Sequence, residues 1–172
     1  MSIRIIITGG TFDKHYDELR GKLTFKDSHL PEILRIVRAT LPFDLEINQM
    51  IDSLEMQMSN RLSILESCRT APEDQIIVIH GTDTMAETAR VLGEAGLAKR
   101  IVLTGAMIPY SVSNSDAVFN LGCSFTAVQL TDPGVYVVMN GKIFSWHNVR
   151  KNKQKGIFEP LSENQSDVIH VQ

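Results

Sequence analysis

The glycine-flanked threonines are the side chains in this sequence best suited to chemistry. Thr11 follows Gly9-Gly10, a pair whose flexible backbone permits a sharp turn and a close approach to a ligand. The same residues also fit an ordinary tight turn, and their spacing matches neither a dinucleotide-binding glycine motif nor a P-loop. Because a threonine hydroxyl is a weak nucleophile that needs a nearby base, Thr11 alone predicts no reaction.

A second polar segment, H-G-T-D-T, spans His80 to Thr84 and precedes a stretch with helical periodicity. Free backbone N–H groups at a helix start favour a carboxylate ligand, although Thr and Asp are also ordinary residues there. Thr84 and Glu87 form a T-x-x-E pattern that predicts a capping box. That assignment leaves Thr82 and Asp83 free for another role.

Short β-branched runs alternate with amphipathic stretches, and these elements must position the polar segments. Strands are expected over residues 3–7, 43–50, 75–80, 101–104 and 135–139, and helices over 31–39, 59–68, 84–97 and 116–130. Asn140-Gly141 predicts a hairpin turn, with 142–145 returning as an antiparallel strand. The alternation predicts an α/β fold: a three-layer, doubly wound, mostly parallel sheet with an antiparallel hairpin near the C-terminus.

Parallel strands end on one edge of a sheet, so the polar segments that follow them should converge there. Residues 13–28 and 51–58 fit no regular element, and both come just after strands. The helix expected over 116–130 should be largely covered by protein, and its apolar positions include Phe119, Cys123, Val128 and Leu130.

Size and charge exclude several classes of protein. The 172 residues fit a single domain, 1–172, and a net charge of −3 gives no reason to expect binding to nucleic acid or to a membrane. The first strand begins right after Met1, which leaves no room for a signal peptide, so we expect a cytoplasmic protein. The five histidines and two cysteines lack ligand or disulfide spacing, so no metal site is expected, and Cys68 and Cys123 read as small buried residues.

Five motifs taken together resemble the bacterial-type L-asparaginase family. They occur in the family's order and spacing, and the similarity extends from Ile3 to about Lys151. The motifs are T-G-G-T (8–11), H-G-T-D-T-M (80–85), L-T-G-A-M (103–107), S-D-A-x-F-N-L (115–121) and V-x-V-V-M-N-G-K (135–142).

The resemblance implies a set of catalytic residues. Thr11 corresponds to the nucleophile, and Tyr16, in an expected mobile lid, corresponds to the tyrosine that assists it. Thr82, Asp83 and Lys151 correspond to a Thr-Lys-Asp relay. The match for Lys151 depends on N-V-R-K-N resembling the family's D-V-T-K-T, so the neighbouring Arg150 and Lys153 stay open as alternatives.

The resemblance also implies a set of substrate-binding residues. Ser53 corresponds to the serine that holds the substrate's α-carboxylate, and Ala106 stands where a backbone carbonyl orients the leaving amide. Leu54 replaces the family's glutamine, which removes a polar contact and should alter recognition of that end of the substrate. The implied binding set is Gly10, Ser53, Leu54, Gly81, Thr82, Asp83 and Ala106.

The implied function is hydrolysis of the side-chain amide of L-asparagine to L-aspartate and ammonia through a threonine acyl-enzyme, with weak glutaminase activity and no cofactor. Longer family members have a C-terminal domain, which this sequence is expected to lack. We therefore expect a homo-oligomer, with the lid edge and the hairpin as contact surfaces. Two alternatives remain: a non-catalytic amino-acid-binding module, and the amidase component of an amidotransferase.

Overall fold

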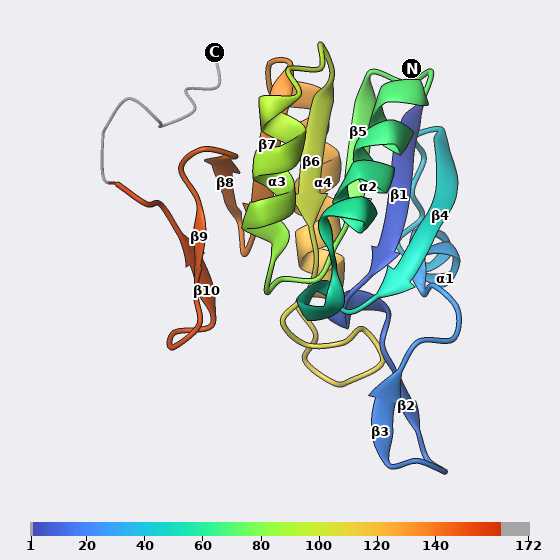
Figure 1. Ribbon diagram of the computed structural model, residues 1–172. Coiled ribbons are helices and arrows are strands. Elements are labelled where there is room, and N and C mark those ends of the chain that lie inside the picture. Colours follow the sequence, from blue (N-terminus) through green and yellow to red (C-terminus); the bar gives the residue numbers. More distant parts are fainter. Residues whose placement is uncertain (1, 163–172) are drawn as a thin grey trace.

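The computed structural model describes residues 2–162, and a six-stranded sheet forms its centre (Figure 1). The strand order is β4-β1-β5-β6-β7-β8. The first five strands in this order pair in parallel, and β8 pairs antiparallel with β7. Their bounds are β1 Ile3–Gly9, β4 Phe43–Ile51, β5 Gln75–Ile79, β6 Arg100–Thr104, β7 Gly134–Met139 and β8 Lys142–Ser145.

Two helices cover each face of the sheet (Figure 1). α2 (Met58–Thr70) and α3 (Met85–Glu94) pack on one face, and α1 (Leu30–Ile36) and α4 (Ala117–Leu130) pack on the other. The middle strands are buried on both sides, which explains why runs such as Ile5, Ile6 and Ile7 are apolar without alternation. The predicted three-layer, mostly parallel α/β fold with an antiparallel hairpin is confirmed.

The order of the parallel strands creates one switch point. The chain goes from β1 outward to β4 and then returns to the other side of β1, where it forms β5. The connections that leave β1 and β5 therefore diverge, and ligands bind outside the carboxyl ends of strands at such a point.

The segments without a predicted element consist of short turns and a hairpin. A 3-10 turn, η1 (Thr11–Asp13), leads into the antiparallel pair β2 (His15–Asp17) and β3 (Lys22–Thr24), which extends from the body (Figure 1). A second 3-10 turn, η2 (Ser53–Glu55), follows β4. A further hairpin of β9 (Arg150–Asn152) and β10 (Ile157–Glu159) follows β8.

Two predicted helices are shorter in the structure. α1 ends at Ile36, and Arg38 then adopts a left-handed backbone with φ of 55°. α3 ends at Glu94, and Gly96 turns the chain with φ of 61°. Left-handed residues of this kind are common just after a helix.

The capping box predicted for α3 is wrong. The Thr84 side chain makes no capping bond and instead donates to the carbonyl oxygen of Ser53, 2.8 Å away. Glu87 pairs with Arg61 of α2 at 2.9 Å. A capping box does occur at the start of α2, between Gln57 and Asn60.

The expectation that α4 is largely covered by protein holds for the side of the helix with Leu121 and Val128, which are buried, and fails for the other side. Phe119 and Leu130 are 60% and 61% exposed, and Cys123 is only half-buried, whereas Cys68 is fully buried as predicted. Among residues 2–162, no helix combines the length and apolar character needed to cross a lipid bilayer.

Candidate active site

The carboxyl ends of β1 and β5 meet through two glycines. A Cβ atom on Gly10 would lie 2.4 Å from the Cα atom of Gly81, a distance that no side chain could accommodate. Gly10 also has a φ of 75°, which favours glycine. Thr11 and Thr82 each follow one of these glycines directly. The contact therefore brings the two predicted threonine segments together at the switch point of the sheet.

The η2 turn lies against the same two strand ends. A Cβ atom on Gly81 would lie 2.6 Å from both Cβ and Oγ of Ser53, so the turn packs directly on the glycine backbone. The hydrogen bond from Thr84 to the Ser53 carbonyl holds the turn from the other side. Ser53 is 1% exposed, and its Oγ has no hydrogen-bond partner within the described part of the chain. A buried hydroxyl of this kind is suited to bind a polar ligand atom.

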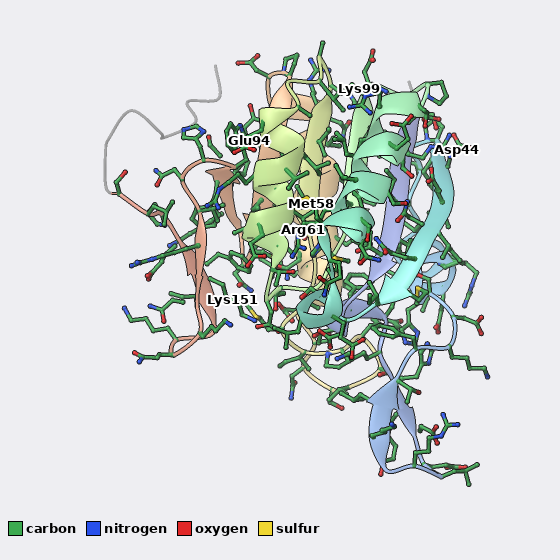
Figure 2. The ribbon with its side chains drawn as sticks, in the orientation of Figure 1. Asp44, Met58, Arg61, Glu94, Lys99 and Lys151 are labelled. Atoms are coloured by element: carbon green, nitrogen blue, oxygen red, sulfur yellow. The ribbon has the colours of Figure 1, made fainter. Side chains whose placement is uncertain are left out.

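Thr82, Lys151 and Asp83 form one hydrogen-bonded group. Lys151 Nζ donates to Thr82 Oγ1 at 2.7 Å and to Asp83 Oδ1 at 2.9 Å. The side chain extends from β9 toward the loops at the lower end of the sheet (Figure 2). Thr82 is 4% exposed and the Lys151 side chain 14%, so their contact is shielded from bulk water, whereas the Asp83 side chain is 32% exposed. An amine in contact with a hydroxyl and a carboxylate can take up and return a proton during nucleophilic attack.

Two packing contacts hold the segment that carries Lys151 against the body of the protein, from where its side chain reaches Thr82. Trp146 lies on Gly93 of α3, where a Cβ atom would be only 2.2 Å from the indole ring. Phe158, which pairs with Lys151 in the β9–β10 hairpin, is buried and belongs to the hydrophobic core on the α2 and α3 face of the sheet. The hairpin is thus anchored to the body on the side from which Lys151 reaches Thr82.

A network that sequence reasoning missed holds the loop after β6. Asp116 accepts hydrogen bonds from the backbone N–H groups of Met107 and Ile108. Asn120 donates to Asp116 and to the carbonyl oxygen of Gly105, both within 3.0 Å. The motif S-D-A-x-F-N-L contains both residues and was the available signal. The network fixes the backbone around Ala106, which is fully buried.

The other residues predicted for the site are more exposed to solvent than Thr82 and Ser53. Tyr16 is 65% exposed on the β2–β3 hairpin, and Leu54 is 63% exposed beside Ser53. Arg150, an alternative to Lys151, instead pairs with Glu159 at 2.8 Å. The other alternative, Lys153, is exposed.

His80 is a buried link between the site and α3. Its Nδ1 lies 2.7 Å from the Gly81 carbonyl oxygen, and its Nε2 lies 2.8 Å from Thr88 Oγ1. Burial lowers the pKa of His80 to about 4, and the charge of Arg61 acts in the same direction, whereas the bond to Gly81 opposes it. The imidazole is therefore neutral near pH 7 and holds the backbone that precedes Thr82.

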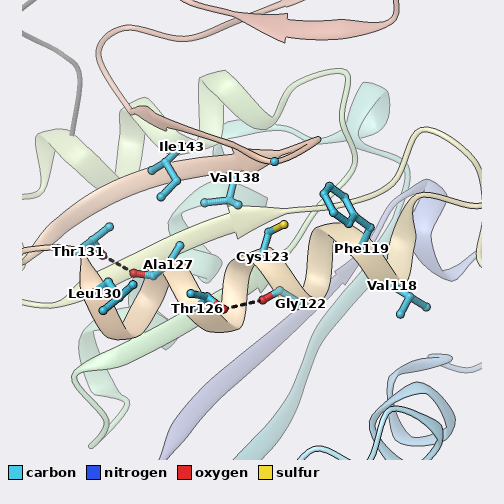
Figure 3. Close-up of a pocket in the computed structure, with 11 residues that line it drawn as sticks. Val118, Phe119, Gly122, Cys123, Thr126, Ala127, Leu130, Thr131, Val138 and Ile143 are labelled. Carbon is cyan, nitrogen blue, oxygen red and sulfur yellow. Dashed lines mark hydrogen bonds between the residues drawn. The ribbon is translucent and has the colours of Figure 1, made fainter. Parts of the chain in front are cut away.

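An apolar hollow lies elsewhere on the molecule. It has a volume of about 560 Å³ and is formed by α4 together with β7 and β8 (Figure 3). None of its lining residues belongs to the predicted site. In residues 2–162, no group of three or more His, Cys, Asp and Glu side chains is arranged to hold a metal ion.

A comparison with protein families gives one match over nearly the whole chain. The model described as "Asparaginase, N-terminal" matches residues 2–170. The L-asparaginase of Thermococcus kodakarensis is 29% identical over 177 residues, which are 99% of this chain and 54% of that protein. Its solved structure covers 93% of this chain and 51% of its own, with a TM-score of 0.80 and 28% identity.

Two further relatives are informative. A probable cytoplasmic L-asparaginase from Campylobacter jejuni matches with a TM-score of 0.77 and 27% identity, over 92% of this chain and 51% of that one. A glutamyl-tRNA(Gln) amidotransferase component from Thermococcus kodakarensis is 31% identical over 152 residues, 82% of this chain and 34% of that protein. The chain thus spans about half the length of the L-asparaginases it matches.

Proposed function

Because the chain belongs to the asparaginase family, whose N-terminal domain matches residues 2–170, we propose that it hydrolyses the side-chain amide of L-asparagine to L-aspartate and ammonia. The observation that carries this proposal is the hydrogen-bonded group of Thr82, Lys151 and Asp83 beside the Gly10–Gly81 contact. Two threonines and an amine at one strand edge supply a nucleophile and a base together.

The proposed reaction has two halves. The hydroxyl oxygen of Thr11 attacks the amide carbon, and its proton passes by way of Thr82 and Lys151 to the departing nitrogen. The C–N bond breaks, ammonia leaves, and an ester joins the aspartyl group to Thr11. Water then attacks the ester, free aspartate leaves, and the threonine hydroxyl is restored. The Thr82 backbone N–H is a candidate donor to the oxyanion that forms in each half.

We assign substrate binding to the polar groups around the switch point. The buried, unpartnered Ser53 Oγ is suited to the α-carboxylate, and Asp83 is suited to the α-ammonium. Gly10 and Gly81 allow close backbone approach, and the fixed backbone at Ala106 is suited to orient the leaving amide. Leu54 offers no polar group, so weak binding of asparagine and some activity on glutamine are expected. We assign Tyr16, on the β2–β3 hairpin, the role of assisting Thr11.

We further propose that this catalytic domain belongs to a homo-oligomer in the cytoplasm. The fourteen residues of α4 include no charged side chain, and Phe119 and Leu130 are exposed beside the apolar hollow. A helix with an uncharged exposed side is usually covered by another protein surface. A second copy presents the same uncharged face, so α4 is a better-supported contact than the lid edge. The likeness to a probable cytoplasmic L-asparaginase supports the location.

The similarity to an amidotransferase component favours a second candidate function, ammonia supply to a partner enzyme. A direct experiment separates the possibilities. Purified protein is mixed with L-asparagine, L-glutamine or a small amide, and released ammonia is measured for wild type, Thr11→Ala and Thr82→Ala. Asparagine hydrolysis that both substitutions abolish supports the proposal. Release from glutamine alone favours the amidotransferase component, and no release from any substrate favours a binding module.

A further inference from the structure

Lys14 lies where four segments around the site meet. Its backbone N–H donates to the Thr11 carbonyl oxygen at 3.3 Å, which closes the η1 turn. Its own carbonyl oxygen accepts from Ser111 Oγ at 2.8 Å, in the loop after β6. Its ammonium lies 5.8 Å from the centre of the Phe25 ring, just past β3, and 2.5 Å from an oxygen of Asp52. Sequence reasoning assigned no role to Lys14 or to Asp52.

Asp52 uses its two oxygens for two different contacts. Oδ1 accepts the backbone N–H of Leu54 at 3.0 Å and so caps the η2 turn that carries Ser53. Oδ2 accepts from the Lys14 ammonium. Burial raises the pKa of Asp52, but the bonds from Lys14 and Leu54 and the charges of Lys14 and Lys151 outweigh that effect, so the pKa is lowered overall. The Asp52 carboxylate is therefore charged near neutral pH.

The pair adds a side-chain link between two segments whose backbones already meet, since Gly9 pairs with Ile51 and the Gly10 N–H donates to the Ile51 carbonyl oxygen at 3.1 Å. The Lys14 and Asp52 side chains are 19% and 28% exposed, so water screens the pair less than it screens a surface ion pair. Beyond Lys14 the β2–β3 hairpin offers little packing, since Tyr16, Leu19 and Leu23 are all exposed. Asp13 accepts hydrogen bonds from the Ser28 hydroxyl and the His29 backbone N–H. These bonds join the two ends of the β2–β3 hairpin to each other and do not involve η2.

From this geometry we infer that Lys14 and Asp52 are positioning residues, which together hold the Thr11 segment against the Ser53 turn. The inference rests on the proposed function, since it makes the ion pair act with the Gly10–Ile51 backbone bond to fix the distance between the nucleophile and the group that binds the α-carboxylate. Neither side chain takes part in the chemistry. A misplacement of about 1 Å at a reacting group can lower a rate by roughly 10²-fold.

Kinetics of four variants and one control variant test the inference. Lys14→Met keeps the length of the side chain but removes its charge, and Asp52→Asn keeps an oxygen for the Leu54 cap. Each should lower kcat for asparagine by roughly 10-fold to 10²-fold with a smaller change in KM. The double variant should have a kcat no lower than that of either single variant, because each substitution already breaks the Lys14–Asp52 ion pair. Lys14→Arg should recover most of the activity. Arg20→Met is the matched control, since it removes an exposed ion pair in the same hairpin and should leave kcat within about twofold.

A measurement without substrate separates this inference from the proposed function. Hydrogen exchange of the wild-type protein should be slow at the amides of Lys14, Leu54 and Glu55, and faster at all three in Lys14→Met and in Asp52→Asn. If the wild type releases no ammonia, the proposed function fails, and the exchange data still decide whether the pair joins the two segments. Unchanged exchange at Leu54 and Glu55 in Lys14→Met, or an unchanged kcat in an active enzyme, would overturn the inference.

Discussion

At the scale of single residues, Lys151 carries the proton transfer that the proposed reaction requires. It touches both Thr82 and Asp83, whereas Lys153, two residues on, is exposed. Lys151→Met should therefore lower kcat by roughly 10²-fold to 10⁴-fold, the usual contribution of a general base. Lys153→Met is the control and should keep kcat within about twofold. Steady-state ammonia release measures kcat for both variants. A larger loss of kcat in Lys153→Met than in Lys151→Met would mean that Lys153 corresponds to the lysine of the family's relay.

His80 makes stability depend on pH. Its pKa is lowered from 6.5 to about 4, so between these values the unfolded state binds the proton more readily than the folded state. The stability that His80 contributes is thus complete above about pH 6.5 and decreases as the pH falls toward 4. The loss from this residue should reach roughly 3 kcal/mol.

Urea unfolding of wild type and His80→Gln across this range measures the effect. Glutamine can still bond to Gly81 and Thr88 but does not titrate, so the variant should lose less stability on acidification. Other groups, including His29, whose pKa burial also lowers, contribute equally to both proteins and cancel in the difference. Parallel pH profiles for the two proteins would show that His80 is not the source.

At the scale of elements, the site depends on how closely η2 packs on the end of β5. Gly81→Ala would place a Cβ atom 2.6 Å from Ser53 and push the turn away. We expect kcat/KM for asparagine to fall by roughly 10²-fold while the protein still folds, since the strands themselves are unaffected. Circular dichroism and steady-state kinetics on the same preparation test this. An alanine variant with normal kcat/KM would mean that Ser53 need not lie against Gly81.

The sequence allowed prediction of the strands because their apolar runs are buried on both faces and need no information from elsewhere in the chain. Ile5 to Ile7 and Ile76 to Ile79 are examples, and glycines marked where these strands end. Parallel pairing of β1 and β5 places the segments of Thr11 and Thr82 at the same edge of the sheet, where Gly10 packs on Gly81. The family motifs supplied Lys151, which no local pattern would have singled out.

Contacts between distant segments explain what the sequence did not reveal. Thr84 and Glu87 have the pattern of a capping box, but each finds a partner outside α3, in Ser53 and Arg61. Lys14 and Asp52 are 38 residues apart and carry no local signal. The exposure of α4 was missed because an apolar helix sequence indicates that a surface is covered without saying by what.

At the scale of the whole molecule, the α4 face should hold copies together. Phe119→Glu combined with Leu130→Glu places charges on that face and should convert the oligomer to monomer. Light-scattering mass measures this directly. Leu19→Glu, at a position 93% exposed on the β2–β3 hairpin, is the control and should leave the mass unchanged. Dissociation by Leu19→Glu instead would make the lid edge the contact, and a monomeric wild type would refute the oligomer itself.

We propose that Thr11, which follows Gly10 where that glycine packs on Gly81, forms a covalent ester with the substrate. Acid quenching during turnover of L-asparagine, followed by peptide mass mapping, tests it most directly. We predict an aspartyl group on the peptide that contains Thr11, and none in Thr11→Ala. An aspartyl group on Thr82, or turnover that persists in Thr11→Ala, would contradict the claim.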